Sequence, residues 1–325
     1  DLPISTGVIL IATVLTLYTL VGGMWSVAMT DIVQLGLLLI GIVLLTFRVL
    51  AELGGGPLSG AAALFDQLDA ELLVWVPTGS FEEMQTWVGL IVIGVFANAA
   101  TQDLAQRMFA ARSSKIAARA TLAAGGLYIF FGAFPVLLGL AADLLLDEAV
   151  VQGVIPALAE QLFSPTLSVV FALTLTAAVT SSVDSGLLAP ASVIARNVVG
   201  PFLKDRISLV ALTRISVVVI AVTSTWMALS GTRAFDLIQG SYAITLPSFV
   251  VLWAALYHKD ARKLPGTLTL AVGVGLWLYE IGRNLASGGT DTEVLSPGFP
   301  VVLLVLCVLV YWASDWVVRR LPSQD

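Results

Sequence analysis

Nine long stretches of this sequence contain no lysine, arginine, aspartate or glutamate, and they constrain the fold more than any other feature. They cover residues 2–30, 32–47, 84–102, 120–142, 161–183, 215–232, 237–257, 264–279 and 294–314. A helix that crosses a bilayer needs roughly 20 mostly apolar residues, and most stretches approach or exceed that length. They lack the alternating pattern of a membrane β-barrel. We therefore predict an all-α polytopic membrane protein with about nine transmembrane helices in one transmembrane domain, residues 1–325.

Charge distribution predicts how the spans are oriented. Only 12% of the residues are charged, against about 25% in a typical soluble domain. If the turn at 24–26 lies inside and the spans alternate, 13 of the 16 basic residues fall on the inner side, and the exceptions are Arg48, Arg233 and Arg283. The positive-inside rule then fixes the orientation. We expect a multi-pass protein of the plasma membrane, or of the inner membrane in a bacterium, surrounded by lipid and without a nucleic-acid partner.

Residues 180–185 place hydroxyls and a carboxylate in the middle of an apolar helix expected from about Thr166 to Val193. Ser181, Asp184 and Ser185 have i, i+3, i+4 spacing and share one helix face. Buried polar atoms are costly in hydrocarbon unless they are satisfied, so hard oxygen ligands here favour a small cation such as Na⁺. The alternative is close helix packing, with each serine bonded to its own helix. Packing alone does not require Asp184.

Two further polar positions interrupt apolar spans. Asp31 and Gln34 lie one turn apart where the second span is expected to begin, and Asp31 could instead cap the start of that helix. In the third span, Asn98, Thr101 and Gln102 fall near mid-membrane. Discontinuous helices of this kind expose backbone groups that bind substrate in secondary transporters. Asp103 and Arg107, further along the span, could form a local i, i+4 pair.

Turn-forming residues and hydrophobic runs divide the chain into elements. The first two spans are expected to join at Gly22 and Gly23. We predict surface helices at Leu58–Leu73 and Val150–Leu162, spans at Ser208–Ser230, Phe235–Tyr257, Pro265–Tyr279 and Pro297–Trp316, an outer loop at Gly282–Ser296, and a kink at Pro190. His258, the only histidine, lies in a polar loop and is expected to be solvated. The single Cys307 and the absence of a nucleophile constellation argue against an enzyme.

Three segments together resemble the sodium/solute symporter family, namely Leu17–Gln34, Gln106–Ser113 and Ala177–Ser185. The resemblance implies a LeuT-type fold of two inverted five-helix repeats. Residues 1–53 then correspond to the last two helices of the first repeat, 84–257 to the second repeat, and 264–318 to two peripheral helices. The N-terminal core helices of the family are absent from this sequence, and we expect them as a partner in the same or a separate polypeptide.

The resemblance also implies specific roles for residues. It assigns a sodium site to Ala178, Ser181 and Ser182, a second cation site to Asp31, Ser181, Asp184 and Ser185, and substrate contacts to Phe96, Asn98, Thr101 and Gln102. The implied activity is sodium-coupled symport of a small organic solute by alternating access. The nearest branch is that of high-affinity choline transporters, although Thr101 replaces the tryptophan of that branch and Ala97 replaces the gate tyrosine of sugar transporters. The alternatives are a solute-sensing domain and a proton-coupled carrier.

Overall fold

The computed structural model describes residues 3–146, 153–203, 206–229, 234–286 and 295–320. Within these ranges the chain forms helices and no strand, and nine helical segments are long and apolar enough to cross a membrane. The prediction of about nine spanning helices is therefore confirmed. The chain divides into two compact units, Asp1–Val74 with Met108–Thr225 and Trp75–Arg107 with Trp226–Asp325. The assignment of 1–53, 84–257 and 264–318 to repeats and peripheral helices stays a prediction.

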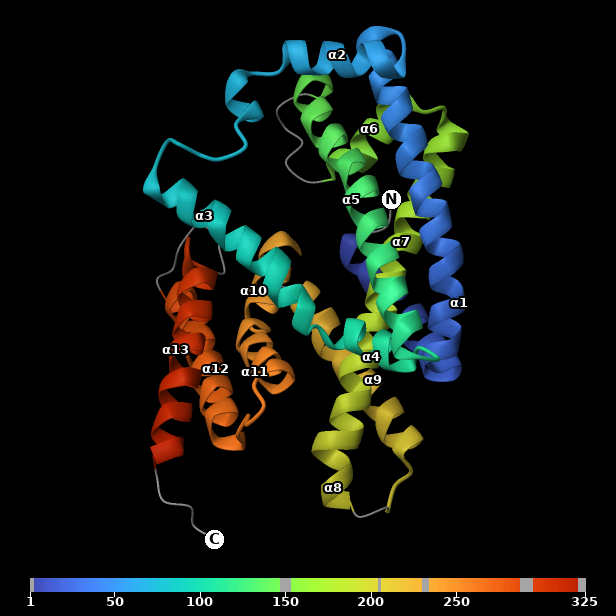
Figure 1. The fold of residues 1–325 in the computed structure, drawn as a ribbon. Helices are drawn as coiled ribbons and strands as arrows, with labels where there is room; N and C mark the ends of the chain where they lie inside the picture. The colour runs from blue at the N-terminus through green and yellow to red at the C-terminus, as the bar shows by residue number, and fades with distance from the viewer. Residues whose placement is uncertain (1–2, 147–152, 204–205, 230–233, 287–294, 321–325) are drawn as a thin grey trace. The chain divides into compact units, whose positions relative to one another are not determined.

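Helix α1 (Ile4–Gly54) opens the first unit (Figure 1) and contains a sharp break at Gly23. Gly23 has φ 59° and ψ −159°, a backbone conformation that strongly favours glycine because it has no Cβ atom. The break separates two spans, Ser5–Gly23 and Val27–Gly54. The turn predicted at Gly22 and Gly23 is confirmed, and the second half of α1 begins several residues before Asp31.

The main core of the first unit forms where the second half of α1 meets four other helices. These are α2 (Pro57–Gln67), α5 (Ser114–Leu145), α6 (Val154–Leu162) and α7 (Pro165–Val193). Leu45, Leu64, Leu138, Leu158 and Phe171 are buried together between them. The short η1 (Ala70–Leu73) follows α2, so the predicted surface helix is two pieces. Residues 150–152 of the other predicted surface helix lie outside the described residues.

Close contact between α2 and α1 depends on Gly60. A Cβ atom at this position would overlap the carbonyl oxygen of Leu50. We expect Gly60→Ala to lower the stability of the unit by about 1–3 kcal/mol, because overpacking a tight contact forces the backbone to shift. Gly139→Ala in α5 is the matched control, since a Cβ there meets no atom within 4 Å. Thermal unfolding in detergent would measure both, and equal melting temperatures would contradict the packing role of Gly60.

The end of α7 continues into η4 (Ile194–Val199), which is wound as a π-helix, and α8 (Gly200–Leu203). Pro190 lies in the last turn of α7, just before this change of winding. Helix α9 (Leu209–Ala228) packs against α7 through a smaller core that includes Leu187 and Val217. Arg214 on α9 donates from Nε to the carbonyl oxygen of Leu20 at 3.1 Å, so it satisfies a carbonyl near the break in α1.

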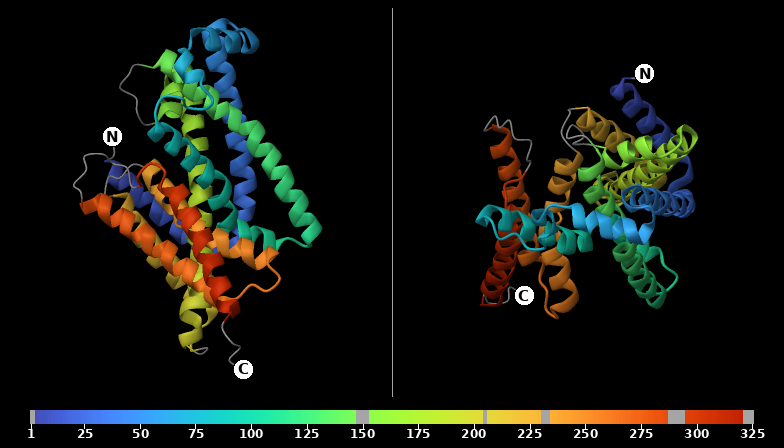
Figure 2. Two further views of the ribbon diagram at one scale, coloured as in Figure 1. Left: turned by 60° about the vertical axis from the view of Figure 1, so that its left-hand side comes forward. Right: turned by 90° about the horizontal axis from the view of Figure 1, so that it is seen from above.

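The second unit contains α3 (Phe81–Val92), η2 (Ile93–Ala97), η3 (Asn98–Ala100), α10 (Ala234–Ala243), α11 (Leu246–Tyr257), α12 (Lys263–Ala286) and α13 (Phe299–Arg320). The last three helices pack together, and they are the orange to red segments in Figure 2. The core of the second unit is centred on Val92, Leu246, Leu303 and Tyr311.

The span predicted over Phe235–Tyr257 is confirmed as Ile238–Tyr257, although its helix is interrupted between α10 and α11. Pro247 in the first turn of α11 has no N–H to continue the preceding helix. The loop predicted from Gly282 begins later, since α12 extends to Ala286. Residues 287–294 of that predicted loop lie outside the described residues.

Candidate ion-binding site

The carboxylate of Asp184 is the centre of the polar segment in α7. Its side chain is 0% exposed, and Thr19, 2% exposed, lies beside it on the first half of α1. Thr19 Oγ1 donates to Asp184 Oδ1 at 3.3 Å. A hydroxyl and a carboxylate that are 165 positions apart therefore meet between two helices of one unit. Thr19 was not among the predicted ligands, because nothing in the local sequence pairs it with α7.

The second half of α1 runs antiparallel to α7 and brings Asp31 to the level of Asp184. Gln34 Nε2 donates to Thr180 Oγ1 at 3.3 Å. Further along, a Cβ on Gly41 would lie 3.2 Å from the ring of Phe171. Because both helices rise by the same amount per residue, this register places Asp31 opposite residues near 183. Asp31 is half-buried inside a continuous helix, so its alternative role as a helix cap does not apply.

The serine hydroxyls of the segment donate to their own helix. Ser181 Oγ donates to the Ala178 carbonyl at 3.0 Å, and Ser185 Oγ donates to the Ser181 carbonyl at 3.3 Å. Ser182 is exposed. If the segment served only close helix packing, each serine would bond to its own helix. Two of the three serines do so. This bonding does not exclude ion binding, since a hydroxyl that donates its proton still carries two acceptor lone pairs.

The arrangement fits a small cation because it leaves buried acceptors unsatisfied. Asp184 Oδ2 and Gln34 Oε1 are buried and have no hydrogen-bond partner among the described residues. Both oxygens accept and cannot donate when Asp184 is ionised. Within the described ranges, no group of three or more histidine, cysteine or acidic side chains could hold a metal ion. Carboxylate, hydroxyl and amide oxygens are hard donors, which suit a hard cation.

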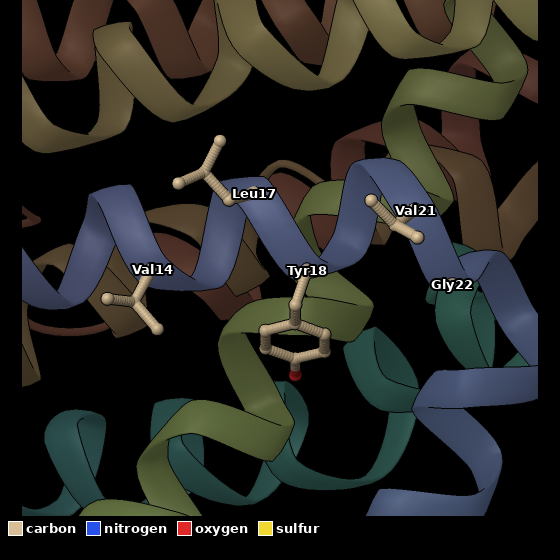
Figure 3. Close-up of a pocket in the computed structure, with 5 residues that line it drawn as sticks. All are labelled: Val14, Leu17, Tyr18, Val21 and Gly22. Atoms are coloured by element: carbon tan, nitrogen blue, oxygen red, sulfur yellow. The ribbon is translucent and has the colours of Figure 1, made fainter.

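A pocket of about 520 Å³ adjoins the first half of α1 and is lined by Val14, Leu17, Tyr18, Val21 and Gly22. Figure 3 shows that Tyr18 and Leu17 project to opposite sides of the helix in this view. The Tyr18 hydroxyl is buried and has no hydrogen-bond partner among the described residues. The pocket is mainly apolar, and Tyr18 in its lining is the sequence neighbour of Thr19.

The discontinuous helix predicted in the third span is present in the second unit. The α-helix ends at Val92, η2 is wound as a π-helix, η3 is a 3₁₀ turn, and Thr101 is extended before α4 (Gln102–Ala110). Asn98 and Gln102 are exposed, whereas the Phe96 ring packs 5.1 Å from that of Phe249.

Local hydrogen bonds use only some of the donors and acceptors at the break in the third span. Thr101 Oγ1 donates to the Asn98 carbonyl at 2.9 Å, and Asn98 Nδ2 donates to the Gly94 carbonyl at 3.1 Å. The local pair expected between Arg107 and Asp103 is present at 3.5 Å. The four predicted substrate residues therefore lie in one irregular segment, and Phe96 is the one that packs into the core.

The break between α10 and α11 contacts the broken helix of the third span. The sequence did not predict this contact. Thr245 Oγ1 donates to the Ala97 carbonyl at 2.9 Å. We expect Thr245→Val to lower stability by about 1–3 kcal/mol, because a buried carbonyl loses its partner while the side-chain volume is kept. Thr245→Ser should restore most of the loss. Thermal unfolding of the two variants would measure this, and an equal loss in both would show that the hydroxyl is not what matters.

Comparison with known proteins decides the family. A model of the sodium:solute symporter family matches residues 1–263. This chain belongs to the sodium:solute symporter family. The chain is accordingly a multi-pass membrane protein of a transporter family and not an enzyme, as its sequence predicts.

The relatives agree with this assignment. High-affinity choline transporter 1 of Drosophila melanogaster is 29% identical over 353 residues, which cover 97% of this chain and 54% of the relative. The human high affinity choline transporter 1 is 28% identical over 254 residues, which cover 70% of this chain and 41% of the relative. The chain thus spans about half the length of the curated relatives it matches.

A solved structure confirms the fold class. The substrate-bound, outward-open structure of a Na⁺-coupled sialic acid symporter, reported with a novel Na⁺ site, has a TM-score of 0.69 to this chain. The match covers 97% of this chain and 67% of that protein, at 18% sequence identity. At this identity the likeness establishes the LeuT-type fold alone.

Proposed function

We propose that this chain takes part in sodium-coupled symport of a small organic solute by alternating access, in the plasma membrane or in a bacterial inner membrane. The observation that carries the proposal is the buried carboxylate of Asp184. It has one oxygen held by Thr19 and the other without a hydrogen-bond partner among the described residues. In a member of this family, a buried acceptor between two helices is best explained by a cation that binds there during transport.

The first proposed sodium site consists of the Ala178 carbonyl and the hydroxyls of Ser181 and Ser182. Rotation of the Ser181 hydroxyl away from Ala178 would release that carbonyl for the ion. In this proposal, the remaining ligands come from other core helices of the transporter. The second proposed site consists of Asp31, Ser181, Asp184 and Ser185, and the antiparallel register of α1 and α7 supports its two-helix composition.

The free energy released when Na⁺ enters the cell is sufficient to accumulate a solute. Moving one charge through 100 mV releases about 2.3 kcal/mol. A tenfold Na⁺ gradient adds about 1.4 kcal/mol, and together they sustain roughly 500-fold accumulation of a neutral solute for each Na⁺. A single sodium ion is therefore enough to drive uptake of a scarce solute.

For the solute, we propose a contact surface at the broken helix, formed by Phe96, Asn98, Thr101 and Gln102. Its exposed amides and the half-buried Thr101 hydroxyl offer both donors and acceptors. The two curated relatives are choline transporters, and choline is therefore the first solute to test. Thr101 lacks the aromatic face that a quaternary ammonium group prefers, so a polar solute is an equally direct test.

Uptake into proteoliposomes, using the protein as it occurs in the cell, tests the proposal. We expect uptake of labelled choline or of a polar solute such as sialic acid to follow an inward Na⁺ gradient and to be insensitive to a pH gradient. Uptake driven by protons alone would identify a proton-coupled carrier. Sodium-dependent binding without uptake would identify a sensor. Either result would overturn sodium-coupled symport.

A further inference from the structure

Five basic residues gather at one end of the second unit, at the ends of α11, α12 and α13. They are Lys259, Arg262, Lys263, Arg319 and Arg320. Arg262 Nη1 donates to the Val318 carbonyl at 2.9 Å and so holds the loop between α11 and α12 against the end of α13. Arg319 Nη2 lies 2.8 Å from His258 Nε2, which connects the same loop to α13 a second time. The loop histidine, half-buried here, is therefore less solvated than its sequence indicates.

Most of this positive charge is not compensated. Asp315 is 2% exposed and accepts from Arg319 Nε at 2.7 Å, and Asp260 lies 4.0 Å from the same guanidinium. Both nearby carboxylates thus face Arg319. Among the described residues, no carboxylate lies within ion-pair distance of the other four cations, and all four are exposed. The cluster can therefore attract an anion, with Arg319 occupied as its structural anchor.

Two tryptophans place the cluster at the depth of a membrane interface. Trp312 and Trp316 lie one turn apart near the end of α13 and are 52% and 55% exposed. The guanidinium carbon of Arg320 lies 3.8 Å from the centre of the Trp316 ring. Tryptophan is enriched at the headgroup level of membranes, and long basic side chains near helix ends extend toward the same level. The charge rule also places this end of the unit on the inner side of the membrane.

We propose that this cluster binds the headgroup phosphate of an anionic phospholipid. Lys259, Arg262, Lys263 and Arg320 contact the phosphate, and Trp312 and Trp316 pack against the glycerol and the upper acyl chains. Charge complementarity selects an anion, and the exposed apolar face of α13 selects a lipid over a soluble phosphate. Basic pockets between membrane helices on the inner side are suited to such headgroups. The proposal does not depend on the sodium site.

Lipid binding to the purified protein in detergent tests the proposal, with native mass spectrometry as the readout. The probes are dioleoyl phosphatidylglycerol, dioleoyl phosphatidylcholine and inorganic phosphate. We expect phosphatidylglycerol to bind at least about tenfold more tightly than phosphatidylcholine, and inorganic phosphate to bind no more than weakly. Equal binding of the two lipids, or binding of inorganic phosphate as tight as that of the lipid, would overturn the proposal without any variant.

A pair of triple variants separates a specific site from general surface charge. Lys259→Gln, Lys263→Gln and Arg320→Gln together should weaken phosphatidylglycerol binding about 100-fold, or about fivefold for each charge. Arg112→Gln, Lys115→Gln and Arg119→Gln remove the same charge near the start of α5 and should change it less than about threefold. Equal losses in the two variants would show that the site is not specific. An unchanged elution volume in gel filtration confirms that each variant is folded.

Discussion

Replacing Ser181 and Ser182 together with alanine is expected to remove Na⁺-stimulated solute uptake. The double variant loses two proposed oxygen ligands of the first sodium site. If each oxygen–Na⁺ contact is worth as much as a hydrogen bond to a charged group, about 1.5–3 kcal/mol, the fall in apparent Na⁺ affinity should reach about 100-fold or more. The fold should be retained, because Ser182 is exposed and the Ser181 hydroxyl donates to a carbonyl of its own helix. Alanine also favours the helix.

The control for this variant is Thr176→Ala. Thr176 lies on the same helix, and its hydroxyl donates to the Ala172 carbonyl at 2.8 Å, so it loses the same kind of local bond. We expect uptake by this control to keep its Na⁺ dependence. If the serine variant also keeps it, the first sodium site is wrongly assigned.

The second large effect is expected from Asp184→Asn. Asparagine has nearly the same shape and can still accept from Thr19 through its amide oxygen, but it carries no charge. Removing a charge from beside a bound cation in a buried site should raise the half-saturating Na⁺ concentration on the order of 100-fold. The rise can be measured as the Na⁺ concentration that half-stabilises the protein against heat, with K⁺ replacing Na⁺ at constant ionic strength.

Asp103→Asn provides a comparison for that measurement. Asp103 forms an exposed pair with Arg107 at 3.5 Å, and such pairs contribute about 0–1 kcal/mol. We expect its half-saturating Na⁺ concentration to equal that of the natural protein. Equal shifts in the Asp103 and Asp184 variants would mean that the effect depends on net charge and not on the site.

The elements that arise from local chemistry could be predicted from the sequence. Uncharged stretches predicted the spans, since the cost of burying charge in hydrocarbon is independent of the fold. The paired glycines at 22 and 23 predicted the break in α1, because only glycine adopts the conformation of Gly23 readily. The polar run from Asn98 to Gln102 predicted the broken helix, and the backbone there is irregular.

The contacts that depend on register between helices could not be predicted. Thr19 meets Asp184, and Gln34 meets Thr180, only because the break at Gly23 turns both halves of α1 toward α7. No local pattern around Thr245 indicates that its hydroxyl reaches Ala97 on another broken helix. Pro247 was a usable signal for the break before α11, because proline favours the first turn of a helix over its interior.

Equilibrium binding of radiolabelled Na⁺ to the purified protein tests the central claim most directly. The claim is that the polar segment of α7 binds sodium. It predicts saturable binding that K⁺ does not compete away, and that is lost when Ser181, Ser182 and Asp184 are replaced by Ala, Ala and Asn. Saturable binding that survives these three substitutions would contradict the claim, as would an absence of saturable binding in the natural protein.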